Sequence, residues 1–196
     1  QFIATTYEGD QSGSNDYSIK FWSTENGVLL RSYQLTGYLP KFVGFLEGQN
    51  KILIHREDEQ FFVFDLDYLS LQQLNSGATS NISTTGYDLS QGRLAIARKD
   101  GSIDIRNIDN SSNFDSYQNF KGHGIRKVAL SRDGKYLAVA STRTMMGAAT
   151  ISLLNLENRS TKIIKELSEN QRVYNLDLAF DSLSNNLAIS TTAQVY

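Results

Sequence analysis

The sequence lacks cysteine altogether and contains only two histidines, His55 and His123, among its 196 residues. The absence of cysteine excludes disulfide frameworks, thiolate zinc sites and cysteine nucleophiles. The two histidines are 68 positions apart, so a histidine-rich metal centre is not expected. Proline occurs once, so the 14 glycines provide most of the turn signals.

Further absences narrow the class of protein. No apolar run approaches the roughly 20 residues of a membrane-spanning helix. The first residues, QFIATTYEGD, contain neither a basic segment nor a long apolar stretch and give no sign of a signal peptide. The formal net charge is -2, so charge gives no argument for nucleic acid or an anionic membrane. We expect an intracellular protein, cytoplasmic or nuclear.

What the sequence does contain is a repeat. Aligned on Trp22, the single Trp, the equivalent positions are Phe64, Arg106 and Leu154, at spacings of 42, 42 and 48 residues. The longer last spacing falls near STRTMMGAAT and indicates an enlarged loop. The four segments, each an alternating or apolar run followed by a polar turn, are YSIKFWSTENG, EQFFVFDLDYL, GSIDIRNIDNS and ATISLLNLENR.

A second set of segments follows the same spacing. KILIHR, RLAIAR and YLAVAS begin at residues 51, 93 and 136, and FIATTY and NLAIST are the matching segments of the first and fifth copies. Two sets that shift together predict a repeated unit of four short strands. In the third copy we expect the strands at 82–89, 93–97, 102–108 and 116–120. For STKIIKELSENQ we expect a strand followed by a loop, with a short helix as the alternative.

A four-stranded sheet repeated about every 42 residues is typical of a β-propeller blade, because stacked blades cover each other's faces. We therefore predict an all-β propeller of antiparallel blades. It forms a single domain, 1–196, incomplete at both ends and part of a larger, seven-bladed ring. The expected repeats, which make about four to five blades, are 1–36, 37–78, 79–121, 122–169 and 170–196. The alternative is a ring of four or five blades whose open edge is completed by another chain.

The fourth copy, GHGIRKVALSRDGKYLAVAST, resembles the WD-repeat family. Gly122-His123 matches the family's Gly-His pair, and Asp133-Gly134 matches the turn into the second strand. SIKFW and KDGSIDI match the third strands of other blades. The resemblance implies a propeller with structural roles for Trp22, Asp100, His123 and Asp133. The copies are divergent, because none keeps the family's full His, Asp, Ser/Thr and Trp network, and Trp22 is followed by Ser23 instead of Asp.

Catalytic, cofactor-binding and metal-ligating residues are not predicted, and no cofactor is expected. Asp65 and Asp67, like the acidic run 57–59, fit solvated turns. GDQSGSND lacks the Lys-Ser/Thr ending of a phosphate loop, and no nucleophile-elbow sequence surrounds a serine.

The expected function is a non-catalytic scaffold that binds other proteins. Five basic residues lie within 23 positions: Lys121, Arg126, Lys127, Arg132 and Arg143. They are either solvated surface charges or part of a binding surface on one rim of the propeller. The candidate contact residues are Tyr38, Arg126, Arg143, Met145 and Met146. Protein partners are favoured over nucleic acid, and no membrane is expected.

Two alternative functions stay open. One is a ligand-sensing or enzymatic propeller with a small molecule or metal at its axial channel. The innermost strands, KFVGFL and KVALS, look apolar apart from their ends, which argues against it. The other alternative is the sensor domain of a multidomain protein.

Overall fold

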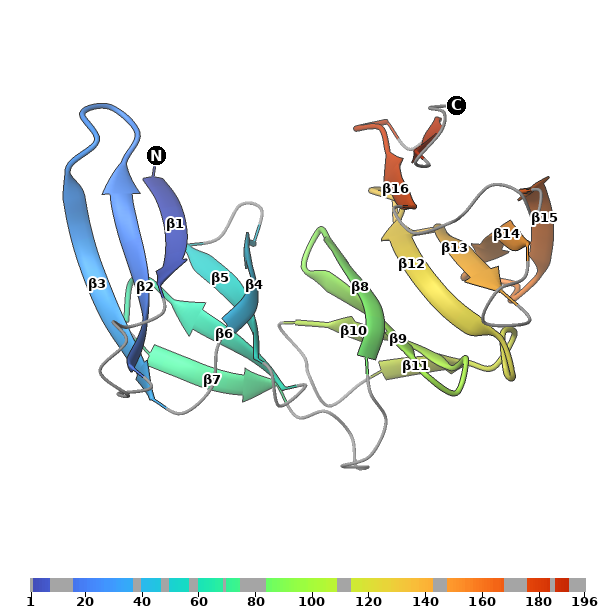
Figure 1. Ribbon diagram of the computed structural model, residues 1–196, viewed down its shortest axis with the longest axis horizontal. Helices are drawn as coiled ribbons and strands as arrows, with labels where there is room; N and C mark the ends of the chain where they lie inside the picture. Colours follow the sequence, from blue (N-terminus) through green and yellow to red (C-terminus); the bar gives the residue numbers. More distant parts are fainter. Residues whose placement is uncertain are drawn as a thin grey trace. The chain divides into compact units, whose positions relative to one another are not determined.

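A computed structural model describes residues 2–7, 16–36, 40–46, 50–56, 60–68, 70–74, 84–108, 114–142, 148–167, 176–183 and 186–190. Every regular element within these ranges is a β-strand, which confirms the all-β class (Figure 1). Contacts between Cα atoms divide the chain into two compact units, residues 1–77 and 78–196. This division lies one residue from the predicted border between the second and third repeats, and each unit is described by itself below.

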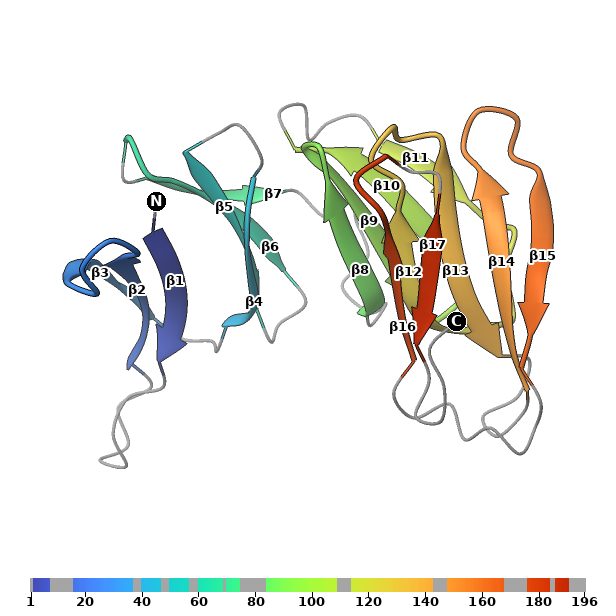
Figure 2. The same cartoon turned by 90° about the horizontal axis from the view of Figure 1, so that it is seen from above.

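The strands form five antiparallel sheets, and hydrogen-bonded neighbours follow chain order within each sheet (Figures 1 and 2). The first unit contains β1 (Phe2–Tyr7), β2 (Asp16–Ser23) and β3 (Leu29–Thr36), then β4 (Pro40–Phe45), β5 (Lys51–Arg56), β6 (Phe61–Asp65) and β7 (Ser70–Leu74). The second unit contains β8 (Thr84–Ser90), β9 (Arg93–Arg98), β10 (Ile103–Asn107) and β11 (Phe114–Tyr117), then β12 (Gly124–Leu130), β13 (Tyr136–Thr142), β14 (Ala149–Asn155) and β15 (Thr161–Glu166), and finally β16 (Asp177–Phe180) and β17 (Leu187–Ser190).

The pairing register confirms that the two sets of repeated segments are equivalent from sheet to sheet. The second set forms β1, β5, β9, β13 and β17. In four sheets, the residue at the Trp22 position pairs with the second residue of the preceding strand. These pairs are Trp22 with Ile3, Phe64 with Ile52, Arg106 with Leu94 and Leu154 with Leu137. The repeat seen in the sequence is therefore a repeat of hydrogen-bonded register.

In the first unit, an aromatic cluster joins the three-stranded sheet to the β4–β7 sheet. Phe21 of β2 stacks on Phe64 of β6 with ring centroids 6.4 Å apart, and Tyr33 lies 4.6 Å from Phe64. Ile52 and Ile54 of β5 complete the same buried cluster. Alternation of side chains along each strand supplies these apolar faces.

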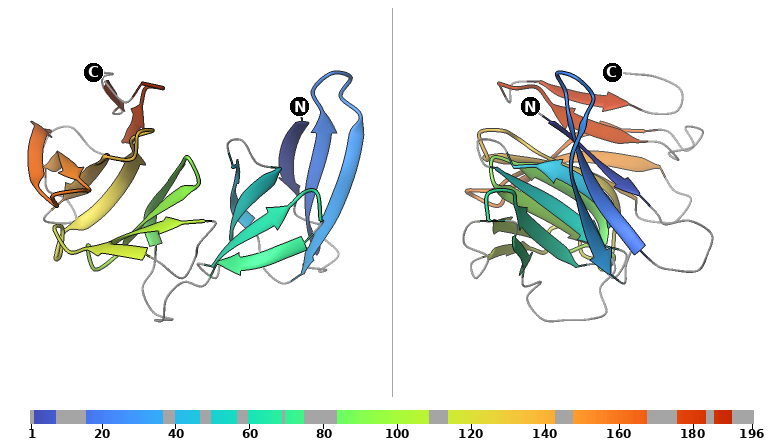
Figure 3. Two further views of the ribbon diagram at one scale, coloured as in Figure 1. Left: turned by 180° about the vertical axis from the view of Figure 1, so that it is seen from behind. Right: turned by 90° about the vertical axis from the view of Figure 1, so that its left-hand side faces the viewer.

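In the second unit, three strands of the β12–β15 sheet, β12, β13 and β14, supply buried side chains to both faces. Figure 3 shows this sheet between the β8–β11 sheet and the β16–β17 pair. Ala95 and Ala97 of β9 pack with Val128 and Val139 on one of these faces. On the other face the small residues are Ala138 and Ala140, which pack with Leu178 and Ile189. The alanines of LAIA and LAVA therefore pack against neighbouring sheets.

The outermost strands agree less closely with the sequence prediction. The fourth strand of the third repeat is β11, Phe114–Tyr117, and not 116–120. Residues 119–122 form a turn, and Phe120 within it is buried in the core between two sheets. The STKIIKE segment forms the strand β15, so the helix alternative is wrong for residues 161–166.

Candidate functional site

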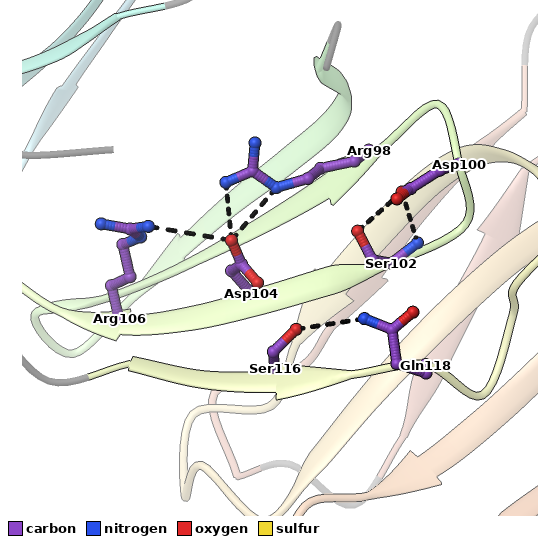
Figure 4. Close-up of polar contacts among 7 residues, drawn as sticks. All are labelled: Arg98, Asp100, Ser102, Asp104, Arg106, Ser116 and Gln118. Atoms are coloured by element: carbon purple, nitrogen blue, oxygen red, sulfur yellow. Dashed lines mark hydrogen bonds and ion pairs between the residues drawn. The ribbon is translucent and has the colours of Figure 1, made fainter. Parts of the chain in front are cut away.

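A tight turn connects β9 to β10 and contains Asp100, one of the predicted structural residues (Figure 4). Its Oδ1 accepts hydrogen bonds from the Ser102 N–H at 2.9 Å and the Ser102 hydroxyl at 2.6 Å. The Ser102 hydroxyl is the main reason that the pKa of Asp100 is lowered from its ordinary value. Asp100 therefore acts as an ionised turn cap.

Gly101 allows a neighbouring turn to pack against this one. It has a φ of +86°, and a Cβ added there would collide with the carbonyl oxygen of Phe120. The Gly122 N–H donates to the Asp100 carbonyl at 3.2 Å. His123 follows in the same chain segment, is half-buried, and donates its backbone N–H to the Phe120 carbonyl at 2.9 Å. The geometry agrees with a structural role for the Gly-His pair.

Asp133 has a comparable position in the turn between β12 and β13. Its Oδ1 accepts the Ser131 hydroxyl at 2.7 Å and the Lys135 N–H at 3.1 Å, which lowers the pKa of the carboxyl. Asp65 likewise caps its turn, because its Oδ1 accepts the N–H groups of Asp67 and Tyr68. Both carboxylates are used locally, which matches their interpretation as turn residues.

A buried ionic cluster lies on one face of the β8–β11 sheet (Figure 4). Arg98 donates through Nε and Nη2 to Oδ2 of Asp104, at 3.1 and 2.6 Å. The Nη2 atom of Arg106 lies 3.7 Å from the same oxygen. The side chains of Arg98, Asp104 and Arg106 are only 10%, 7% and 3% exposed. Arg106 stands at the Trp22 position, so an ionic group replaces the aromatic ring in this repeat.

The electrostatics of this cluster favour a structural role. Burial lowers the pKa of Arg106 from its ordinary value, and Asp104 acts in the opposite direction. The three side chains come from β9 and β10, whose opposite face supplies Ala95 and Ile103 to the core. A carboxylate held by a guanidinium fork at this depth is poorly placed to act as a general base for a substrate.

A second charged group connects the first strands of successive sheets. Oδ2 of Asp88 on β8 accepts the N–H of Leu130 on β12 at 2.6 Å. Lys127 on β12 forms an ion pair with Asp177 on β16, with Nζ and Oδ1 2.8 Å apart. Burial raises the pKa of Asp88, whereas the Lys127 partner lowers the pKa of Asp177. The sequence did not indicate this first-strand row, Asp88, Lys127 and Asp177, because KVALS and KFVGFL look apolar apart from their ends.

The basic residues singled out from the sequence do not all gather at one end of the sheet. Lys121 precedes β12 and Arg132 follows it, so these two residues flank opposite ends of a seven-residue strand. Lys127 is committed to Asp177. Arg126 is exposed and lies at a β-bulge in β12, where the register shifts between Ile125 and Lys127. The prediction of a shared rim therefore does not apply to Arg132.

Four of the five candidate contact residues lie outside the described part of the chain. These are Tyr38, Arg143, Met145 and Met146. The two residues that flank 143–148, Thr142 and Ala149, pair with each other, and Thr142 also pairs with Gly124 at the start of β12. Thr142 and Ala149 therefore lie at the same end of the sheet as the 119–123 turn.

Exposed apolar side chains gather on the outermost strands β3, β7 and β15. Leu29 and Leu30 are 43% and 51% exposed, Leu71 is 44% exposed, and Ile163 and Ile164 are 56% and 40% exposed. In β3 and β15 the register shifts at these residues, so that Leu30 and Ile164 are the extra residues of β-bulges. The sequence contained this signal, because GVLLRS carries three adjacent apolar residues and TKIIKE carries two, each next to polar residues.

Within the described ranges, no group of three or more His, Asp or Glu side chains is arranged to hold a metal ion. In the same ranges, no helix has the length and apolar character needed to cross a membrane. A scan against protein-family models finds no match, and a search of curated protein sequences finds none either.

Proposed function

We propose that the chain forms divergent WD-repeat-like propeller blades and serves as a non-catalytic platform that binds other proteins. The observation that carries the proposal is the exposed apolar pairs on the outermost strands, Leu29–Leu30 and Ile163–Ile164. Exposed apolar surface of this kind is typical of sites that partners cover. The repeated register, and the apolar clusters that join neighbouring sheets within each unit, support the blade architecture.

The polar groups described above support binding more than catalysis. Asp100, Asp133 and Asp104 each accept hydrogen bonds from neighbouring residues of the chain, so their carboxylates serve the fold. Arg126 is exposed on β12, and it stays a proposed contact residue, as do Tyr38, Arg143, Met145 and Met146, which lie outside the described residues. A sensor domain of a larger protein would use the same surfaces.

Partner capture from the protein's own cells tests the platform. The tagged wild type is compared with the double variant L30K/I164K, which places charges on both exposed pairs. Leu183→Lys is the matched control, because Leu183 is 74% exposed but lies in the turn after β16. We expect to capture proteins that bind the wild type and the control but bind the double variant only weakly. Each captured protein should also bind the purified wild type directly. Equal capture by all three proteins would refute a binding role for the outermost strands.

The first-strand row favours a second candidate function, which is small-molecule binding at the first strands of the sheets. Asp88, Lys127 and Asp177 bring charges of both signs to neighbouring strands. Thermal-shift screening with charged metabolites tests it, with K127M/D177L as the comparison. A ligand that stabilises the wild type and not this variant would favour the second candidate. A ligand that stabilises both equally would rule out a site at this row.

A further inference from the structure

β15, Thr161–Glu166, is the outermost strand of its sheet (Figure 2). Among the described residues it pairs only with β14. All six of its residues are exposed, including Ile163 and Ile164. An open strand edge that also exposes apolar side chains is the kind of surface to which a further strand adds.

The backbone of β15 presents peptide groups along this edge. The Asn155 N–H donates to the Ser160 carbonyl at 2.8 Å, so hydrogen-bonded pairs alternate from that point along β14 and β15. Leu153 and Lys162 are the next hydrogen-bonded pair in this register, which directs the N–H and C=O of Thr161 and Ile163 away from β14. The bulge at Ile164 interrupts the alternation, so the strand that fits this edge is short.

The charges on this edge select the chemistry of a partner. β15 carries two cations, Lys162 and Lys165, and one anion, Glu166. Arg159 precedes β15, and its Nη2 lies 3.7 Å from Oδ1 of Asp115. Lysines on an edge strand discourage unselective strand pairing. The same lysines attract an extended segment that carries carboxylates, and opposite charges on paired strands stabilise the pairing. A nucleic acid has no peptide groups with which to continue the sheet.

We propose that β15 binds an extended, acidic peptide segment of a partner protein, which adds to the β12–β15 sheet as a fifth strand. Apolar residues of that segment cover Ile163 and Ile164, and its carboxylates face Lys162 and Lys165. The inference rests on the proposed function, because it names the class of partner that the platform binds.

Fluorescence anisotropy with a short labelled peptide that alternates Glu and Val tests the proposal. We expect the peptide to bind the purified protein and to bind more weakly as salt is raised. The variant K162E/K165E should weaken binding by about tenfold or more, because like charges then face each other. Ile163→Pro removes an outward N–H and no bond to β14, and should weaken binding by about fivefold or more. Circular dichroism checks that both variants keep the fold.

Two controls separate strand addition from general attraction. The double variant K99E/K135E makes the same change of charge in two exposed turns, and should bind the peptide like the wild type. A peptide of equal charge with Pro in place of Val should not bind, because Pro cannot donate to the ladder. Equal losses in K99E/K135E and K162E/K165E, or binding of the Pro peptide, would overturn the proposal.

The remaining outcomes are equally informative. Stronger binding of single-stranded DNA than of the peptide, lost in K162E/K165E, would assign the edge to nucleic acid instead. Self-association that Ile163→Pro abolishes in sedimentation experiments would assign it to a second copy of the chain. If cellular partners are captured but the peptide does not bind, the proposal of strand addition is refuted and the proposed partner-binding function is retained. If the peptide binds but no cellular partner is captured, the proposed partner-binding function is refuted instead.

Discussion

At the scale of single residues, the turn glycines differ in what their surroundings allow. Gly92 and Gly101 both have positive φ, at +70° and +86°, and both belong to the β8–β11 sheet. A Cβ at Gly92 would have no atom within 4 Å, whereas a Cβ at Gly101 would collide with the Phe120 backbone. The two positions therefore separate conformational strain from steric conflict.

Alanine substitutions at these two positions should differ in cost. We expect Gly92→Ala to cost about 1–2 kcal/mol in unfolding free energy, the cost of a left-handed conformation alone. Gly101→Ala should cost clearly more, because the turn that holds Phe120 must move. Urea unfolding followed by circular dichroism measures both. Equal costs would contradict the close packing of the two turns.

A buried carboxyl also makes stability depend on pH. The pKa of Asp88 is raised from its ordinary value of 3.8, mainly by burial. The stability gained from its protonation is therefore complete below pH 3.8 and is lost as the pH rises through the raised pKa. Asp177 behaves in the opposite way, because the pKa of its carboxyl is lowered, first of all by Lys127.

Removing each charge should therefore have opposite effects at neutral pH. Asp88→Asn keeps an oxygen that can accept the Leu130 N–H, and should stabilise the protein at pH 7 but not in acid. Asp177→Asn should destabilise it at pH 7, by an amount that shrinks with added salt and on acidification. Thermal unfolding across a pH series measures both. A destabilised Asp88→Asn protein at pH 7 would mean that the ionised hydrogen bond outweighs burial.

At the scale of elements, the bounds of second and third strands could be predicted from the sequence more closely than those of the outermost strands, although the outermost strand β15 was expected. RLAIAR contains a continuous apolar run because β9 is buried on both faces. SIDIRN alternates, with Ile103 and Ile105 on the core face of β10. β7, SLQQL, is exposed at four of its five positions and carries no such constraint. The same reason explains the displaced prediction for β11.

The candidate site was predictable only in part. Asp100 and Asp133 could be found because Asp-Gly turns have a local signature. The Asp88–Leu130 contact joins residues 42 positions apart, equal to the repeat period, so it becomes visible only when repeats are stacked in space. Asp104 could have been suspected, because a carboxylate between Ile103 and Ile105 in a buried strand needs a cationic partner.

The Arg98–Asp104–Arg106 cluster gives an element-scale prediction. Asp104→Ala leaves two guanidiniums on a buried face without their shared carboxylate, and should cost about 3–5 kcal/mol. The triple variant R98M/D104L/R106M replaces the cluster with apolar side chains of similar size. It should be neutral or should stabilise the protein by up to about 4 kcal/mol. Urea unfolding compares the variants. A loss for Asp104→Ala below about 1 kcal/mol would be typical of a solvated, surface pair.

At the scale of the whole molecule, the division of the chain at residue 77 defines two parts with their own cores. The second unit contains both the cluster around Val128 and Val139 and the cluster around Ala138 and Ile151. In repeat proteins each unit is stabilised by its interfaces with its neighbours, so a cut that removes a covering sheet removes that interface. The position of a cut should therefore decide whether a fragment folds.

We expect a fragment of residues 78–196 to fold and to unfold cooperatively on heating, because it retains both clusters. A fragment of residues 124–196 is the matched control. It keeps β12–β17 but loses Ala95, Ala97 and Ile103, so Val128, Leu137 and Val139 face water. It should bind hydrophobic dyes and lack a cooperative transition. If neither fragment folds, residues 1–77 are required for the second unit to fold. That outcome would contradict the expectation that the two clusters of the second unit are sufficient.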